Sequence, residues 1–184
     1  MNTTSAQPGT EREQLLAMLR RSADSYLAAM AEIPEGVVSA KPDANSWSAI
    51  ELAEHIAVAE HGMFRLIEMG APKTTPVQFD RDAWVREFVP NRSKKAQAPE
   101  RSHPKGRWKT IPEATEAFKQ ARTRSIEFAE NPVNDLRRIE VGHPLFGPLD
   151  AHQMLMVMSG HVERHLKQLE EIKQCPAYLA ALQS

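Results

Sequence analysis

A helical stripe near the end of the chain constrains the fold more than any other feature of the sequence. Its positions follow alternating steps of four and three residues, the spacing of a helix that buries one face. These positions are Met154, Met158, His161, His165, Gln168 and Ile172. The stripe therefore predicts a long core helix that carries two histidines where apolar residues would be expected.

The two histidines, His161 and His165, stand four residues apart, so their rings project from the same face of the helix. Burying two such rings costs on the order of a few kcal/mol unless each ring finds a hydrogen bond or a ligand. Two interpretations are open for this pair taken alone: a metal-binding pair, or two core histidines satisfied by neighbouring side chains or water. A third histidine ligand on another element would favour the metal-binding interpretation.

Three other stretches begin with a capping box and continue as an amphipathic stripe. The boxes pair Thr10 with Glu13, Ser48 with Glu51, and Thr110 with Glu113. Together with the first stripe they predict four long helices, over residues 10–33, 48–70, 110–130 and 150–174. No stretch shows a convincing strand pattern. The sequence thus predicts an all-α fold, an up-and-down four-helix bundle with a long connection between its second and third helices.

That connection, residues 71–109, is predicted to be a long irregular excursion, because its prolines leave room for no more than a short helix over 80–88. Residues 91–109 hold seven basic residues against one acid, Glu100. A nucleic-acid contact is one interpretation of this charge. We favour a solvated loop that covers the bundle end, because Trp108 is the only aromatic residue there that could stack on a base.

The composition fits one domain over residues 1–184, of which we expect 1–9 to be flexible. The net charge of -1 gives no bias toward nucleic acid or a membrane surface, so we expect a small-molecule substrate. No apolar run approaches the roughly 20 residues that a membrane span needs. The single cysteine, Cys175, cannot form an internal disulfide. We therefore expect a cytoplasmic protein.

A third histidine, His55, lies on the apolar side of the second predicted helix. Its row is Leu52, His55, Ala59, Gly62 and Leu66. His61 falls in a mostly charged row and is set aside. Three neutral imidazoles suit zinc or another late first-row divalent ion, and three ligands leave positions open for water or substrate. The sequence thus predicts a metal site on His55, His161 and His165.

Spacing argues against two other metal chemistries. A zincin needs a glutamate directly after the first histidine, where this chain has Val162. A carboxylate-bridged di-iron site needs a glutamate three residues before each ligand histidine, and here those positions hold Leu52, Met158 and Val162. A mononuclear site is therefore favoured, and no catalytic base is assigned.

The remaining polar candidates receive structural roles. Glu51 and Glu60 are interpreted as solvated charges of the second helix. His143 and His152 are placed outside the metal shell, since nine residues of helix beyond His152 span roughly 13 Å. Gln168 is predicted to orient a ligand histidine.

Three motifs together make the chain resemble the DinB superfamily. They are Ser46-Trp47-Ser48 ahead of His55, His143-Pro144-Leu145-Phe146-Gly147, and His161-x-x-Arg164-His165-x-x-Gln168. The resemblance covers nearly the whole chain, and the three histidines are its most specific part. It implies a bundle with a long crossover between helices two and three, and one divalent metal ion on those histidines.

The resemblance also implies a range of functions. Some relatives transfer or isomerise groups with a low-molecular-weight thiol such as bacillithiol, mycothiol or glutathione, and dimers are frequent. We therefore expect one zinc or nickel ion per chain, a thiol as co-substrate, and a homodimer. The first interpretation is a metal-dependent thiol S-transferase; the alternatives are a metal-dependent hydrolase and a non-enzymatic bundle stabilised by metal.

Overall fold

The computed structural model describes residues 10–75, 81–93, 95 and 97–183. The four long helices are α1 (Glu11–Ala31), α2 (Ala49–Glu68), α4 (Ile111–Glu130) and α5 (Ala151–Lys173). The shorter elements are α3 (Asp82–Phe88), α6 (Pro176–Ala181), the 3₁₀ helices η1 (Glu35–Val37), η2 (Glu100–Ser102) and η3 (Leu136–Arg138), and the strands β1 (Ala71–Pro72), β2 (Ile139–His143) and β3 (Gly147–Asp150). The flexibility predicted for 1–9 lies outside the described residues.

The starts of the long helices follow the sequence closely. All three predicted capping boxes form, and Asp150 with Gln153 makes a fourth at the start of α5. These caps satisfy the free N–H groups of each first turn and so fix where each helix begins. The short helix predicted over 80–88 is observed as α3, although residue 80 itself lies outside the described residues.

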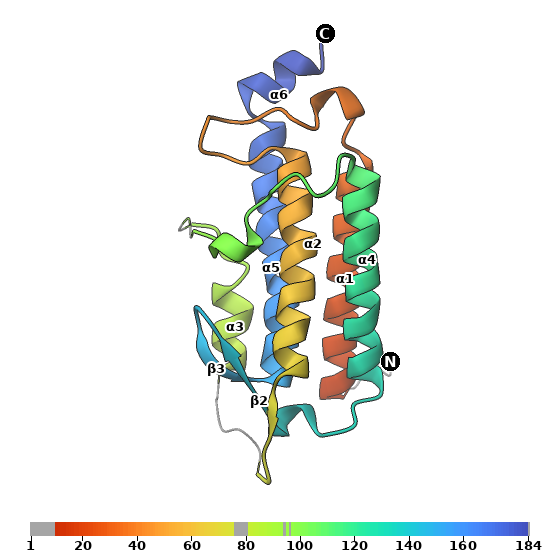
Figure 1. Cartoon of the computed structure of the whole chain (residues 1–184), viewed down its shortest axis with the longest axis vertical. Coiled ribbons are helices and arrows are strands. Elements are labelled where there is room, and N and C mark those ends of the chain that lie inside the picture. The colour runs from red at the N-terminus through yellow and green to blue at the C-terminus, as the bar shows by residue number, and fades with distance from the viewer. Residues whose placement is uncertain (1–9, 76–80, 94, 96, 184) are drawn as a thin grey trace, which may run out of the picture.

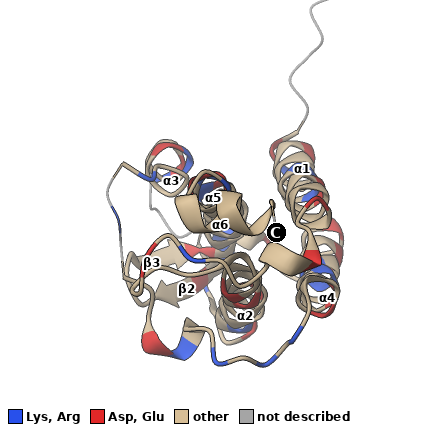
Figure 2. Cartoon of the chain, turned by 90° about the horizontal axis from the view of Figure 1, so that it is seen from above, with Lys and Arg blue, Asp and Glu red and all other residues tan. Residues whose placement is uncertain are grey.

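The four long helices stand side by side as a bundle (Figure 1). Seen from above, α1, α5, α2 and α4 occupy successive corners, so α1 and α2 face each other across the diagonal (Figure 2). The core fills the space between them in two clusters of buried residues, one toward each end. None of the described helices is long and apolar enough to cross a membrane.

The predicted up-and-down order is wrong at one step, because α2 and α4 run in the same direction (Figure 1). Their contacts advance together along both helices, from the Glu60–Arg122 ion pair to the Phe64–Phe128 ring contact. The long connection returns the chain to the end of the bundle where α2 began. A helical stripe defines a buried face and carries no information on direction, so the sequence could not reveal this order.

The all-α prediction also missed a small antiparallel sheet of order β1-β2-β3. Strands β2 and β3 form a hairpin that closes at His143 opposite Gly147, and Gly147 has the positive φ of 73° that the turn requires. β1 pairs with the other edge of β2. These strands span two to five residues and include Gly142 and Pro148, too little for a period of two to stand out in the sequence.

Candidate metal centre

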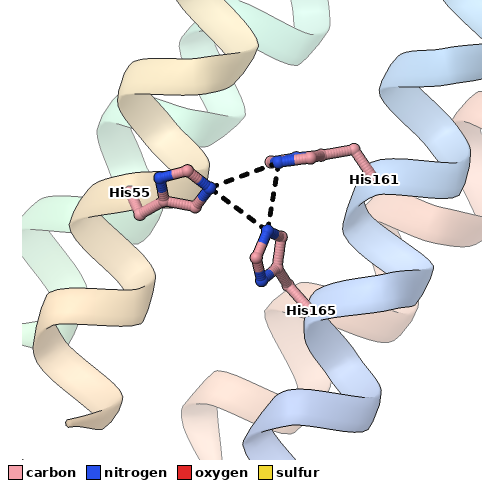
Figure 3. A group of neighbouring side chains, drawn as sticks. All are labelled: His55, His161 and His165. Carbon is pink, nitrogen blue, oxygen red and sulfur yellow. Dashed lines mark hydrogen bonds between the residues drawn. The ribbon is translucent and has the colours of Figure 1, made fainter. Parts of the chain in front are cut away.

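The three predicted histidines converge at one point between α2 and α5 (Figure 3). His55 comes from α2, and His161 and His165 come from successive turns of α5. Their Nε2 atoms form a triangle with sides of 3.2 Å (His55–His161), 3.1 Å (His55–His165) and 3.0 Å (His161–His165). The fold thus brings together nitrogen atoms from residues more than a hundred positions apart.

Two of the rings have their tautomer fixed by a partner on the far side. His55 Nδ1 lies 2.8 Å from the Ser102 carbonyl oxygen, and His165 Nδ1 lies 2.9 Å from Gln168 Oε1. Each acceptor requires a proton on Nδ1, so the Nε2 of each neutral ring is a bare lone pair. These two lone pairs face each other 3.1 Å apart.

The third ring cannot resolve this conflict. His161 Nδ1 is enclosed and has no partner among the described residues, so its one proton can move to Nε2. From there it can donate toward His55 or His165, yet the contact between those two still lacks a proton. A cation at the centre of the triangle would satisfy all three nitrogens at once. The three histidines therefore fit a single metal ion.

Extra protonation is an unfavourable alternative. Burial lowers the pKa of His55 to about 4. Burial first, and then the charge of the neighbouring histidines, holds the pKa of His161 and of His165 well below the usual range. The site is therefore neutral near pH 7 and presents lone pairs, the form of imidazole that binds metal.

The triangle has the size that a single ion needs. Ligand nitrogens lie about 2.0–2.1 Å from zinc, which separates two of them by about 3.3 Å in a tetrahedral arrangement and about 2.9 Å in an octahedral one. The observed separations of 3.0–3.2 Å fall between these limits. Three ligands from the chain leave at least one position open to an exogenous molecule.

A strap from the long connection holds His55 in place. Glu54, the residue before His55, is only 2% exposed, and its carboxylate accepts hydrogen bonds from the N–H groups of Lys105 (2.7 Å), Gly106 (2.9 Å) and Arg107 (3.1 Å). The Arg107 guanidinium adds a fourth at 2.9 Å. These bonds hold residues 105–107 against α2, while η2, three residues earlier, supplies the Ser102 carbonyl oxygen that His55 uses.

Sequence reasoning missed this strap, because Glu54 lies in the same mostly charged row as His61 and the basic segment was predicted to be solvated. A carboxylate on the polar side of a helix looks solvated until its partners are known. The positive φ of Gly106, 70°, allows three successive N–H groups to turn toward one carboxylate, but a lone glycine in a loop is too common to predict it.

Trp47 closes another side of the site. Its ring lies 4.5 Å from the His55 ring, centroid to centroid, and 6.5 Å from that of His165. His103, next to Ser102, meets the same indole edge-on at 6.0 Å. The indole thereby excludes water from one face of the histidines.

The other polar residues considered in the sequence lie outside the histidine triangle. Glu60 is fully buried in an ion pair with Arg122, so its interpretation as a solvated charge is wrong. Glu51 is half-buried, caps α2 and pairs with Lys41. His61 is exposed and contacts Arg124 away from the triangle. His143 lies at the hairpin tip, in neither metal-binding group of the described residues.

A second group of possible ligands, formed by Glu11, Asp82 and His152, already contains a cation. The guanidinium of Arg137 pairs with Glu11, with Asp82 at 2.5 Å and with Asp150 at 2.9 Å. Because this arginine pairs with all three carboxylates, the group is a structural network that ties α1, α3 and α5 together.

Comparison with known proteins identifies the fold and the family of the chain. The solved structure of YfiT from Bacillus subtilis, described as a probable metal-dependent hydrolase with an unusual four-helix bundle topology, matches with a TM-score of 0.60 over 95% of this chain and 92% of that one. The two sequences are 11% identical, so this likeness concerns the fold. No curated protein matches the chain. The sequence model of the DinB superfamily matches residues 18–169, and the chain is therefore a member of the DinB superfamily.

Proposed function

We propose that the protein binds one divalent metal ion, zinc or nickel, through His55, His161 and His165 and uses its open position to activate a small nucleophile. The observation that carries this proposal is the contact between two Nε2 lone pairs, which a cation at the centre of the triangle would satisfy. Such an ion lowers the pKa of a bound thiol or water, so that an anionic nucleophile exists near neutral pH.

The residues of the chain prepare the site for this task. The Ser102 carbonyl oxygen and Gln168 hold two of the rings in the ligating tautomer. Burial and the neighbouring histidines are the main causes that lower the pKa of His161 and of His165, and the charges of Arg92 and Arg164 are smaller causes. Arg92 is itself paired with Glu171.

A thiol S-transferase with a low-molecular-weight thiol as co-substrate is our first assignment. Soft thiolate is a good ligand for zinc. A hydrolase that activates water is the second, supported by the fold shared with YfiT. A non-enzymatic role, in which the ion cross-links α2 and α5, is the rival from another class.

A thiol-conjugation assay separates these functions. The metal-loaded protein is mixed with monobromobimane and each of several cellular thiols, and turnover is compared with that of the chelator-treated protein, His161→Ala and the control His61→Ala. Turnover that requires metal, is lost in His161→Ala and persists in His61→Ala supports the transferase. Turnover of ester or amide substrates alone would assign the hydrolase. Bound metal without turnover of either kind would favour the structural role.

A further inference from the structure

The three histidines of the candidate metal centre differ in what lies behind each ring. His55 and His165 each have an acceptor for the Nδ1 proton, the Ser102 carbonyl oxygen at 2.8 Å and Gln168 Oε1 at 2.9 Å. Nδ1 of His161 is buried and has no hydrogen-bond partner among the described residues. An imidazole that binds a metal ion through Nε2 carries its proton on Nδ1. Of the three rings, His161 alone would therefore bind with a buried N–H that lacks an acceptor.

This difference weakens one of the three bonds to the ion. When His161 does not bind metal, its proton can lie on Nε2 and point toward His55 or His165, at 3.2 and 3.0 Å. Binding through Nε2 moves that proton to the enclosed Nδ1, where the N–H loses its hydrogen bond. An acceptor behind a ligand histidine also raises the basicity of Nε2 and fixes the orientation of the ring. His55 and His165 have both advantages, and His161 has neither.

The surroundings of the three rings differ in the same sense. His55 and His165 are only 2% and 7% exposed, and both rings lie against the Trp47 indole. His161 is partly exposed, and its aromatic contacts within the described part of the chain are with the other two histidines. The side of the triangle that an exogenous molecule can reach is therefore the side beside His161 (Figure 3).

We propose that His161 is the weakly held and exchangeable ligand of the site, whereas His55 and His165 are the pair that retains the ion. The firm pair joins α2 to α5, and the exchangeable ligand lies where an exogenous molecule enters. Release of His161 gives such a molecule a further position on the ion without loss of the metal. This inference rests on the proposed function, because it presumes a metal ion on the three histidines.

The first test compares the zinc affinities of three alanine variants of the full chain, measured by competition with a chelator. We expect His161→Ala to bind zinc about 10-fold more tightly than His55→Ala or His165→Ala, the size of the effect that an acceptor behind a ligand histidine has. Circular dichroism of each metal-free variant checks that its helices are intact. Equal affinities in the three variants, or the weakest binding in His161→Ala, would overturn the inference.

The wild-type chain provides a test that does not depend on the folding of a ligand variant. The zinc-loaded protein is labelled with ¹⁵N in its histidine rings and followed by NMR on warming. Because a weakly held ring exchanges between bound and free states, the Nε2 resonance of His161 should broaden while those of His55 and His165 stay sharp. Three resonances that broaden together, or earlier broadening of His55 or His165, would contradict the inference.

Removal of an acceptor tests the cause of the difference. Gln168→Ala leaves His165 without an acceptor on Nδ1, as His161 is, so the zinc affinity should fall about 10-fold and the His165 resonance should broaden as well. Gln120→Ala, which changes an exposed glutamine of α4, is the matched control and should alter neither quantity. An unchanged zinc affinity in Gln168→Ala would overturn the inference, because acceptors would then not set the strength of a ligand.

The outcomes separate this inference from the proposed function. A wild-type chain that binds no zinc overturns both. A chain that binds one zinc ion through three equivalent histidines overturns the exchangeable ligand alone and leaves the metal site intact.

Discussion

Two clusters of buried polar side chains share α2 and α5, and they differ in whether the chain satisfies them. In the first, the guanidinium of Arg122 pairs with Glu60 at 2.5 and 2.9 Å and donates further to Ser22 and to the carbonyl oxygens of Leu19 and Met158. Residues of the chain itself satisfy all of this charge and these hydrogen bonds, so we call this group the closed cluster and the histidine group the open cluster. In the second, the Nε2 lone pairs of His55 and His165 face each other without a proton between them.

This difference indicates which cluster stabilises the fold and which cluster is suited to bind a ligand. Arg122 connects α1, α2, α4 and α5 through its partners, so the closed cluster fixes the helices on which the histidines stand. We therefore expect the bundle to fold without a cation on the histidines. A buried polar group that the chain leaves unsatisfied is a candidate for function, whereas a satisfied one is part of the core.

The largest effect is expected from breaking the closed cluster. Arg122→Ala leaves the Glu60 carboxylate buried without its counter-charge, and should lower the free energy of unfolding by about 3–5 kcal/mol. Urea denaturation of the metal-free protein measures this loss. Arg20→Ala, which removes a mostly exposed pair with Glu130, is the control and should cost less than about 1 kcal/mol. Equal losses in the two variants would show that the closed cluster does not stabilise the bundle.

A smaller effect is expected when acid is applied to the open cluster. The pKa of His55 is lowered to about 4 in the folded chain, against about 6.5 when unfolded. Between these values the unfolded chain binds a proton that the folded chain does not, so stability decreases as pH falls from 6.5 to 4. His55 alone should contribute about 3 kcal/mol of this decrease by pH 4.

The comparison that isolates this contribution is with His55→Ala, because other groups also titrate in the same range. Urea denaturation of both metal-free proteins at several pH values gives the two slopes. We expect a shallower slope in the variant. Identical slopes would mean that the folded site accepts protons as readily as the unfolded chain.

The smallest effect tests the strap that supports the open cluster. Glu54→Gln removes the charge that holds Arg107 and weakens three backbone hydrogen bonds, so that the Ser102 carbonyl oxygen positions His55 less well. Zinc affinity, measured by competition with a chelator, should fall about 10-fold. Glu68→Gln, at the exposed end of the same helix, should leave it unchanged. An unaltered zinc affinity in Glu54→Gln would show that the strap does not support the metal site.

The sequence predicted the parts of this molecule that depend on local periodicity. Capping boxes such as Ser48 with Glu51 located the helix starts, and the stripe through His161 and His165 placed both rings on the buried face. The row through His55 did the same on α2. These predictions hold because a helix fixes which residues share a face, whatever packs against it.

The features that the sequence did not reveal all depend on tertiary partners. Glu54 and Glu60 lie on helix faces that look polar, and only the strap and Arg122 show that both are buried. The parallel course of α2 and α4, and the pairing of the short strands, likewise depend on where the long connection leads the chain.

The central claim is that three histidines from two helices hold one ion, and metal analysis of His55→Ala tests it most directly. Elemental analysis after dialysis, with calorimetric titration of zinc or nickel into the metal-free chain, should give one equivalent per wild-type chain and the same for His61→Ala. His55→Ala, with only the two α5 imidazoles left, should lose at least about 100-fold in affinity and retain almost no metal. Wild-type levels of tightly bound metal in His55→Ala would remove α2 from the site and contradict the account.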